Sequence, residues 1–137
     1  MPELLAKKIT LIQDYLRQLE EYLRQCLGAK QPDNSAVFSV ERLFQLVVDE
    51  AVDVNMIILE KEKHSLPDTN QGTFAALKDG GTIGEELHNR IAGSVGLRNR
   101  LVHRYETVQR SVLLREVQKY TAAYKEYLKL IIKKFLQ

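Results

Sequence analysis

The chain has 137 residues, of which 45% are hydrophobic and 28% are charged, a composition that suits one compact globular domain over residues 1–137. Its formal net charge is only +2, so any contact with nucleic acid has to depend on a local basic cluster and not on a global excess of charge. Six arginines from Arg90 to Arg115 form such a local excess.

Cys26 is the single cysteine of the chain, so it has no partner for an internal disulfide or for a zinc site. A free thiol of this kind indicates a reducing compartment, and the cytoplasm is the expected location. No stretch approaches about 18 consecutive apolar residues, the minimum for a membrane-spanning helix. The N-terminal "MPELLAKKIT" places charges among its leucines, so neither a secreted nor a membrane protein is expected.

Two long amphipathic helices are predicted in the first half of the chain. Apolar residues recur at alternating steps of four and three along the first, which indicates a helix from about Glu3 to Leu27 that Gly28 ends. The loop "GAKQPDNS", rich in turn-forming residues, precedes a second stripe, whose helix should end before Pro67. The two stripes consist of Leu5, Ile9, Ile12, Leu16, Leu19 and Leu23, and of Val40, Leu43, Val47, Ala51, Val54 and Ile58.

The second half of the chain predicts three more helices. The segment "TFAALKDGG" indicates a short helix closed by two glycines, and Thr82 with Glu85 has the spacing of a capping box that starts a fourth helix near Ile83. No segment alternates with the period of a β-strand, so the predicted fold class is all-α, an up-and-down bundle of about five helices. The apolar stripe of the last helix consists of Leu113, Val117, Tyr120, Tyr124, Leu128, Ile131 and Phe135.

The stretch "GLRNRLVHRYETV", which directly follows the fourth helix, concentrates three arginines, a histidine and a tyrosine. Asn99 and His103, four residues apart, would share one face of a helix, whereas Arg98 and His103 would point about 140° apart. Either the helix bends here or Arg98 reaches around it. Gly93 and Gly96 are poor helix formers that indicate such an irregularity or a tight contact. The residues expected to anchor the segment in the core are Leu97, Leu101 and Val102.

A histidine and an arginine in one site suit the cleavage of RNA without a metal ion or cofactor. Imidazole titrates near neutral pH and can move protons, and a guanidinium can hold a phosphate or stabilise the charge that develops on it. The RNA's own 2′-hydroxyl can serve as the nucleophile, with the histidine as general base or acid. The spacing of Arg98 and His103 alone is equally compatible with a solvated helix face that carries one hydrogen-bonded histidine.

The segment "RNRLVHRY" resembles the Arg-x4-His-x-Tyr motif of the HepT-like toxins, a branch of the HEPN (higher eukaryotes and prokaryotes nucleotide-binding) ribonuclease superfamily. Arg98, His103 and Tyr105 occupy the three motif positions, and Asn99 matches the polar residue that commonly follows the arginine. The resemblance extends over nearly the whole chain, and it includes the second-helix segment "SVERLFQLVVDEAVDVNMII" and the segment "IAGSVGLRNRLVHRY".

This resemblance implies a homodimeric, metal-independent endoribonuclease in which the motifs of two subunits face one cleft. His103 is then expected to transfer protons, Arg98 to stabilise phosphate charge and Asn99 to help position the site. The family also implies a toxin–antitoxin system in which a minimal nucleotidyltransferase, typically encoded beside the toxin, neutralises it. The nucleotidyltransferase acts either by binding, in a hetero-oligomer, or by attaching AMP to Tyr105.

The dimer is also plausible on physical grounds, because one chain offers a single histidine in the motif. A two-fold axis through the cleft would let one histidine serve as base and its mate as acid. Arg100 and Arg104 would hold neighbouring phosphates along the RNA strand, and they are assigned a binding role only.

Other polar residues receive a structural interpretation. The acidic residues Asp49, Glu50 and Asp53 of the second helix could orient an arginine or histidine of the cleft, but a solvated or salt-bridged helix face is preferred. His64 and His88 are expected to lie on the surface. The tyrosines other than that of the motif are expected to pack with their hydroxyls in water.

The sequence therefore predicts a cytoplasmic HepT-like toxin that binds RNA, a second copy of itself and a nucleotidyltransferase antitoxin, and that has no membrane partner. Two alternatives stay open. One is a non-catalytic helical adaptor that keeps the HEPN surface to bind nucleotide, RNA or a nucleotidyltransferase. The other is a four-helix partner-binding protein whose motif helix only packs.

Overall fold

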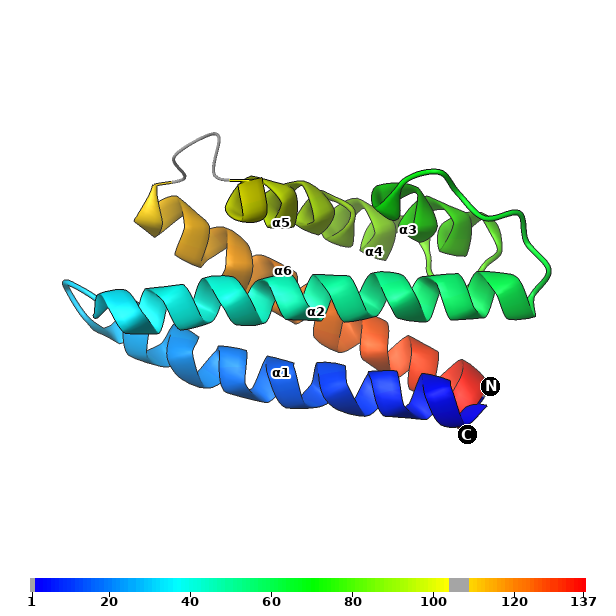
Figure 1. Ribbon diagram of the computed structural model, residues 1–137, viewed down its shortest axis with the longest axis horizontal. Helices are drawn as coiled ribbons and strands as arrows, with labels where there is room; N and C mark the ends of the chain where they lie inside the picture. The colour runs from blue at the N-terminus through cyan, green and yellow to red at the C-terminus, as the bar shows by residue number, and fades with distance from the viewer. Residues whose placement is uncertain (1, 104–108) are drawn as a thin grey trace.

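The computed structural model describes residues 2–103 and 109–137, and the regular elements in these two ranges are all helices (Figure 1). The prediction of an all-α fold is confirmed. Within the same ranges, no helix is long and apolar enough to cross a membrane. The elements are α1 (Pro2–Gly28), α2 (Asn34–Lys61), α3 (Asn70–Asp79), α4 (Glu85–Ile91), α5 (Gly93–His103), α6 (Arg110–Ile131) and the π-helical turn η1 (Ile132–Leu136).

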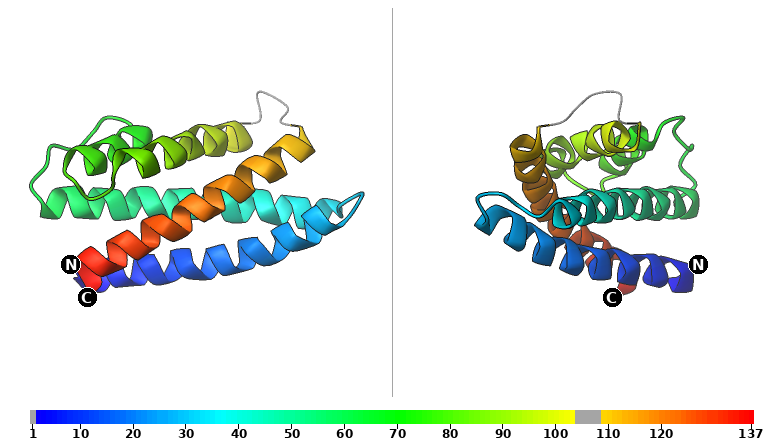
Figure 2. Two further views of the ribbon diagram at one scale, coloured as in Figure 1. Left: turned by 180° about the vertical axis from the view of Figure 1, so that it is seen from behind. Right: turned by 60° about the vertical axis from the view of Figure 1, so that its left-hand side comes forward.

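Helix α2 lies at the centre of the arrangement. Helix α1 packs along one side of it, and α3, α4 and α5 lie on its other side (Figure 1). Helix α6 runs diagonally behind α2 and contacts both α1 and α4 (Figure 2). The two termini lie at one end of the bundle, while the end of α5, the start of α6 and the loop between α1 and α2 lie at the other.

The core is built from the predicted amphipathic stripes. Each stripe residue of α1 and α2 is buried, with 8% exposure at most, so both periodicity arguments are confirmed. The prediction of solvated tyrosine hydroxyls is wrong for Tyr124 and Tyr127, which are fully buried. Tyr127 donates a hydrogen bond of 2.6 Å to Oδ1 of Asn55, and the Tyr124 hydroxyl lies 2.7 Å from Oγ of Ser94. Their hydroxyls are satisfied inside the protein, as burial of a polar group requires.

Side chains cap two of the helices, but the predicted capping box is wrong. Asp33 accepts a hydrogen bond from the Ser35 amide at the start of α2, and Thr69 caps α3 in the same way. Helix α4 begins at Glu85, after Gly84, with no side-chain cap. Thr82 lies two residues before the N-cap position, its amide donates to the carbonyl of Leu77 at the end of α3, and its hydroxyl accepts a hydrogen bond of 3.3 Å from Lys134.

The predicted fourth helix and the motif stretch that follows it form two helices, α4 and α5, which are separated at Ala92. Helix α5 is regular from Gly93 to His103, so the irregularity lies before the motif and not within it. The whole described part of the motif therefore belongs to one straight helical element beside α2.

Candidate functional site

Helix α5 is held in the core by its apolar residues and by one buried hydrogen bond. Leu97 and Leu101 are buried, as predicted, whereas Val102 is 41% exposed and does not anchor the helix. Ser94 is completely buried; its hydroxyl donates to the carbonyl of Ile91 at 2.6 Å and accepts a hydrogen bond of 2.7 Å from the Tyr124 hydroxyl on α6. Burial raises the pKa of Tyr124, so this tyrosine stays neutral as a hydrogen-bonding partner.

The two glycines of α5 have different surroundings. A Cβ atom at Gly93 would lie 2.5 Å from the hydroxyl of Tyr120, so this glycine permits a tight contact between α5 and α6, as predicted. Burial is the main cause that raises the pKa of Tyr120, and the nearby Arg100 acts in the opposite direction. At Gly96, a Cβ atom would meet nothing within 4 Å. Packing against the residues that the structure describes therefore does not require a glycine at position 96.

Arg98 is held against α2 by a bidentate interaction with Asp49. Its Nε donates to Oδ1 of Asp49 at 2.8 Å and its Nη2 donates to Oδ2 at 3.3 Å. Its Nη1 donates to Oδ1 of the neighbouring Asn99 at 3.4 Å. The side chains of Arg98 and Asp49 are 24% and 38% exposed, so the pair lies at the edge of the core and remains open to solvent on one side.

Asp49 orients the motif arginine, which is the alternative that was not preferred for the acidic residues of the second helix. Of the three acidic residues on α2, Glu50 and Asp53 pair instead with Lys8 of α1, at 2.9 and 3.0 Å, which confirms the salt-bridged interpretation for these two. A signal for Asp49 does exist in the sequence. It lies in the run "VVDEAVDV", where Val47, Val48, Ala51 and Val52 are buried, and a carboxylate inside such a run requires a charged partner.

The exposed face of α5 carries the remaining described motif residues. Gly96, Asn99 and His103 follow each other at steps of three and four and are all exposed, so the predicted common face of Asn99 and His103 is confirmed. Arg100 is exposed beside them. Arg98 points instead toward α2. The two other predicted site residues, Arg104 and Tyr105, lie outside the described residues.

A groove opens between α2 and the end of α5. It has a volume of about 360 Å³, and its walls include Phe38 and Gln45 of α2 and Leu101 and Val102 of α5. Phe38 is 53% exposed, so an apolar surface adjoins the exposed motif face.

The other two histidines lie away from the motif. His64 is exposed on the loop between α2 and α3, and His88 is half-buried on α4. Among the described residues, no group of three or more histidine, cysteine, aspartate or glutamate side chains is placed to hold a metal ion.

The arrangement combines a fixed cation with an exposed imidazole. A guanidinium has five N–H donors, of which Arg98 uses three on Asp49 and Asn99 within the described chain, so two remain for an anion. His103 lies more than one helical turn further along the same helix, where its ring reaches solvent. Such a surface can bind a phosphate and exchange a proton with a group next to it.

Comparison with known proteins finds relatives over most of the chain. The family model described as "Ribonuclease HepT-like" matches residues 12–131. A tRNA nuclease HepT from Aphanizomenon flos-aquae is 35% identical over 107 residues, which are 78% of this chain and 73% of that protein. An mRNA nuclease HepT from Shewanella oneidensis is 20% identical over 134 residues, 96% of this chain and 98% of that protein.

A solved structure has the same fold. It is the tri-AMPylated Shewanella oneidensis HEPN toxin in complex with the MNT antitoxin, with a TM-score of 0.88, 21% identity, and coverage of 98% of this chain and 100% of that one. The family match spans far more than half of the chain and agrees with this fold. The chain therefore belongs to the HepT-like ribonuclease family.

Proposed function

We propose that the chain is the toxin of a toxin–antitoxin pair and that it cleaves RNA in the cytoplasm without a metal ion. The observation that carries this proposal is the position of Arg98, fixed by Asp49, next to the exposed Asn99 and His103 on one helix. Relatives named as tRNA and mRNA nucleases support the reaction. The similar HEPN toxin, solved with its MNT antitoxin, supports the pairing.

In the proposed reaction, His103 takes the proton from a 2′-hydroxyl of the RNA, and the resulting oxygen attacks the neighbouring phosphate. The bond from phosphorus to the 5′-oxygen of the next nucleotide breaks, and that oxygen receives a proton from a second acid. The two remaining N–H donors of Arg98 stabilise the charge on the phosphate. Asn99 holds the guanidinium from its other side, and Arg100 and Arg104 bind flanking phosphates.

A second copy of the chain would supply the second acid. The exposed side of α5 carries Gly96, above which there is open space, and it adjoins the exposed apolar residues Phe38 and Val102. Apolar surface beside a polar site is typical of interfaces between protein chains. In a two-fold dimer closed across this face, one His103 acts as base and the other as acid.

The antitoxin is proposed to be a minimal nucleotidyltransferase that binds the toxin and attaches AMP to Tyr105. A nucleotide on that tyrosine adds bulk and negative charge two residues after His103. The added charge competes with an RNA phosphate for Arg98 and Arg104. Inhibition by this route persists after the antitoxin dissociates.

Expression in bacteria, with and without the nucleotidyltransferase encoded next to this gene, tests the proposal. The wild-type chain should stop growth, and the His103→Ala variant should not. Co-expression should restore growth and raise the mass of the Tyr105 peptide by one or more nucleotide monophosphates, as mass spectrometry would detect. Growth unaffected by the wild-type chain would contradict the toxin role, and an unmodified Tyr105 in a neutralised complex would mean that the antitoxin acts by binding alone.

A further inference from the structure

We propose a second binding site for RNA phosphates, at the end of the bundle where α1 ends and α6 begins. This site, called the basic pocket below, is defined by Lys30, Arg110 and Arg115 around a hollow of about 600 Å³. The inference rests on the proposed function, because the ligand is the backbone of the same RNA that the motif cleaves. None of its three basic residues belongs to the motif.

The basic pocket is a hollow with defined walls. Cys26 and Leu114, both buried, line it from α1 and α6, and Pro32 lines it from the loop between α1 and α2. Arg110 donates a hydrogen bond of 2.9 Å from Nη2 to Oδ1 of Asn34, which joins the start of α6 to the start of α2. This bond ties the start of α6, which lines the pocket, to the residue that follows the α1–α2 loop, which lines it as well.

The charge of the basic pocket is largely uncompensated. In the ranges 2–103 and 109–137, Lys30 and Arg115 form no ion pair and no side-chain hydrogen bond, and both are exposed. Asp33, close to Lys30 in the sequence, forms no ion pair in these ranges; its carboxylate accepts hydrogen bonds from the amide and hydroxyl of Ser35 at 3.2 and 3.1 Å and keeps its negative charge, one against the three positive charges of the pocket. Two unpaired cations that share one concave surface attract an anion more strongly than isolated surface charges do.

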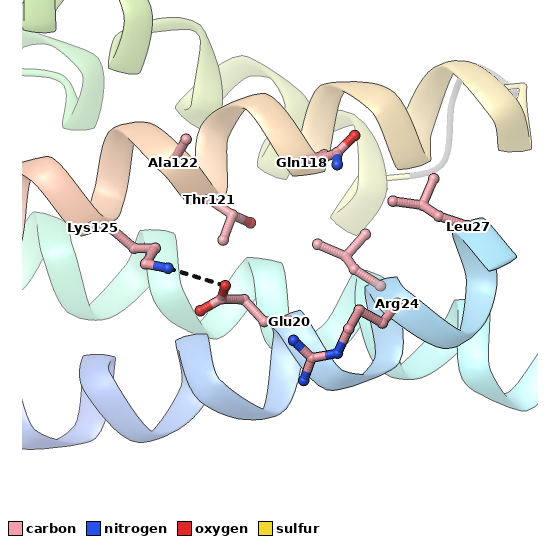
Figure 3. Close-up of a pocket in the computed structure, with 8 residues that line it drawn as sticks. Glu20, Arg24, Leu27, Gln118, Thr121, Ala122 and Lys125 are labelled. Carbon is pink, nitrogen blue, oxygen red and sulfur yellow. Dashed lines mark hydrogen bonds and ion pairs between the residues drawn. The ribbon is translucent and has the colours of Figure 1, made fainter.

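The neighbouring pocket along the same helices provides a contrast. It lies between α1 and α6, shares Leu27 with the basic pocket, and has a volume of about 240 Å³ (Figure 3). Lys125 there is paired with Glu20 at 3.1 Å, and Arg24 is paired with Glu21 at 2.6 Å. The cations of that pocket are therefore paired with carboxylates of the protein, whereas Lys30 and Arg115 of the basic pocket have no such partner among the described residues.

The location of the basic pocket favours RNA as its ligand. Helix α5, which ends at His103, runs toward the end of the bundle where α6 starts and where the loop between α1 and α2 lies (Figures 1 and 2). A single strand that crosses the motif can therefore continue toward Lys30 and Arg115. Grooves of positive charge that follow the backbone are the usual means by which proteins hold single strands regardless of sequence.

The experiment measures the salt dependence of RNA binding in the His103→Ala background, so that the probe is not cleaved. The probe is a fluorescent oligouridylate, and the variant is Lys30→Gln with Arg115→Gln. Each lost phosphate contact on a single strand lowers the slope of log Kd against log salt concentration by about 0.7, so the double variant should lower it by about 1.4. Arg110 is left unchanged because its bond to Asn34 has a structural role.

The control is Lys7→Gln with Lys129→Gln, which also removes two positive charges, but from exposed positions near the termini. This control should keep the wild-type slope. A slope for the Lys30 and Arg115 variant equal to that of the control would overturn the proposal. So would a variant that binds RNA normally but no longer binds the nucleotidyltransferase, because the basic pocket would then be a protein-docking site. RNA cleavage by the wild-type chain tests the proposed function separately, and its failure leaves the binding result interpretable.

Discussion

The guanidinium of Arg98 on α5 donates two hydrogen bonds, 2.8 and 3.3 Å long, to the carboxylate of Asp49 on α2. Both side chains are partly exposed, and ion pairs of this kind contribute only about 0–1 kcal/mol to stability. The contact therefore matters mainly for orientation, because it holds the motif arginine at one place beside the exposed face of α5.

Replacing Asp49 with alanine should reduce the rate of RNA cleavage more than it reduces stability. Without the carboxylate, Arg98 samples other rotamers, and a misplaced group of this type costs about tenfold to a hundredfold in rate. The loss should appear in kcat more than in KM. The matched control is Asp53→Ala, one helical turn further along α2, whose carboxylate pairs with Lys8. Equal losses in the two variants would contradict a positioning role for Asp49.

Alanine substitutions at the two glycines of α5 should have opposite effects on stability. At Gly93 a Cβ atom would lie 2.5 Å from the Tyr120 hydroxyl, so we expect a destabilisation of about 1–3 kcal/mol. At Gly96 the space is open, and the higher helix propensity of alanine should stabilise the chain by up to about 1 kcal/mol. Chemical denaturation measures both. Adding Tyr120→Phe to Gly93→Ala should recover stability, and no recovery would show that the hydroxyl is not the obstacle.

The protein should lose stability in alkaline solution. Burial raises the pKa of Tyr124 and of Tyr127 above the ordinary value of 10.0. From about pH 10 upward the unfolded chain releases these protons while the folded chain keeps them, so the free energy of unfolding falls as the pH rises. Urea denaturation across this range measures the fall, and Tyr127→Phe should make it less steep. The same steepness in that variant would rule Tyr127 out as a cause.

The free protein should be a dimer that depends on the apolar surface beside the motif. Light scattering should give about twice the chain mass of 15.8 kDa. Phe38→Glu places a charge on an exposed apolar residue of this surface and should yield a monomer. The control is Leu66→Glu, on a leucine that is 49% exposed in the segment between α2 and α3. A wild-type chain that is monomeric at micromolar concentration would remove the two-histidine site from the mechanism.

Most of the fold could be predicted from the sequence because it depends on local periodicity. The stripes of α1 and α2 are buried at each predicted position, since steps of three and four define one helix face wherever the helix packs. The start of α4 could not be predicted in the same way. Thr82 has the spacing of a cap, but the N-cap position is Gly84, and the Thr82 hydroxyl accepts a hydrogen bond from Lys134, which is 52 residues away in the sequence.

The site was predictable to the extent that it lies on one helix. The common face of Asn99 and His103 follows from their separation along α5. The partner of Arg98 does not, because Asp49 is 49 residues away in the sequence and meets it only where α5 packs on α2. The prediction that Val102 anchors α5 in the core is wrong, because an apolar side chain in the sequence does not reveal that its side of the helix faces solvent.

The central claim is that the motif on α5 cleaves RNA. The most direct test measures how fast purified proteins cleave a labelled RNA in excess EDTA. The proteins compared are the wild-type chain and the His103→Ala and Arg98→Ala variants. The wild-type chain should cleave under these conditions, and each variant should be slower by about a hundredfold or more. Helix content should stay the same, because both side chains lie outside the buried core. A variant within about twofold of the wild-type rate would exclude its residue from the site, and no cleavage by the wild-type chain would favour the non-catalytic adaptor.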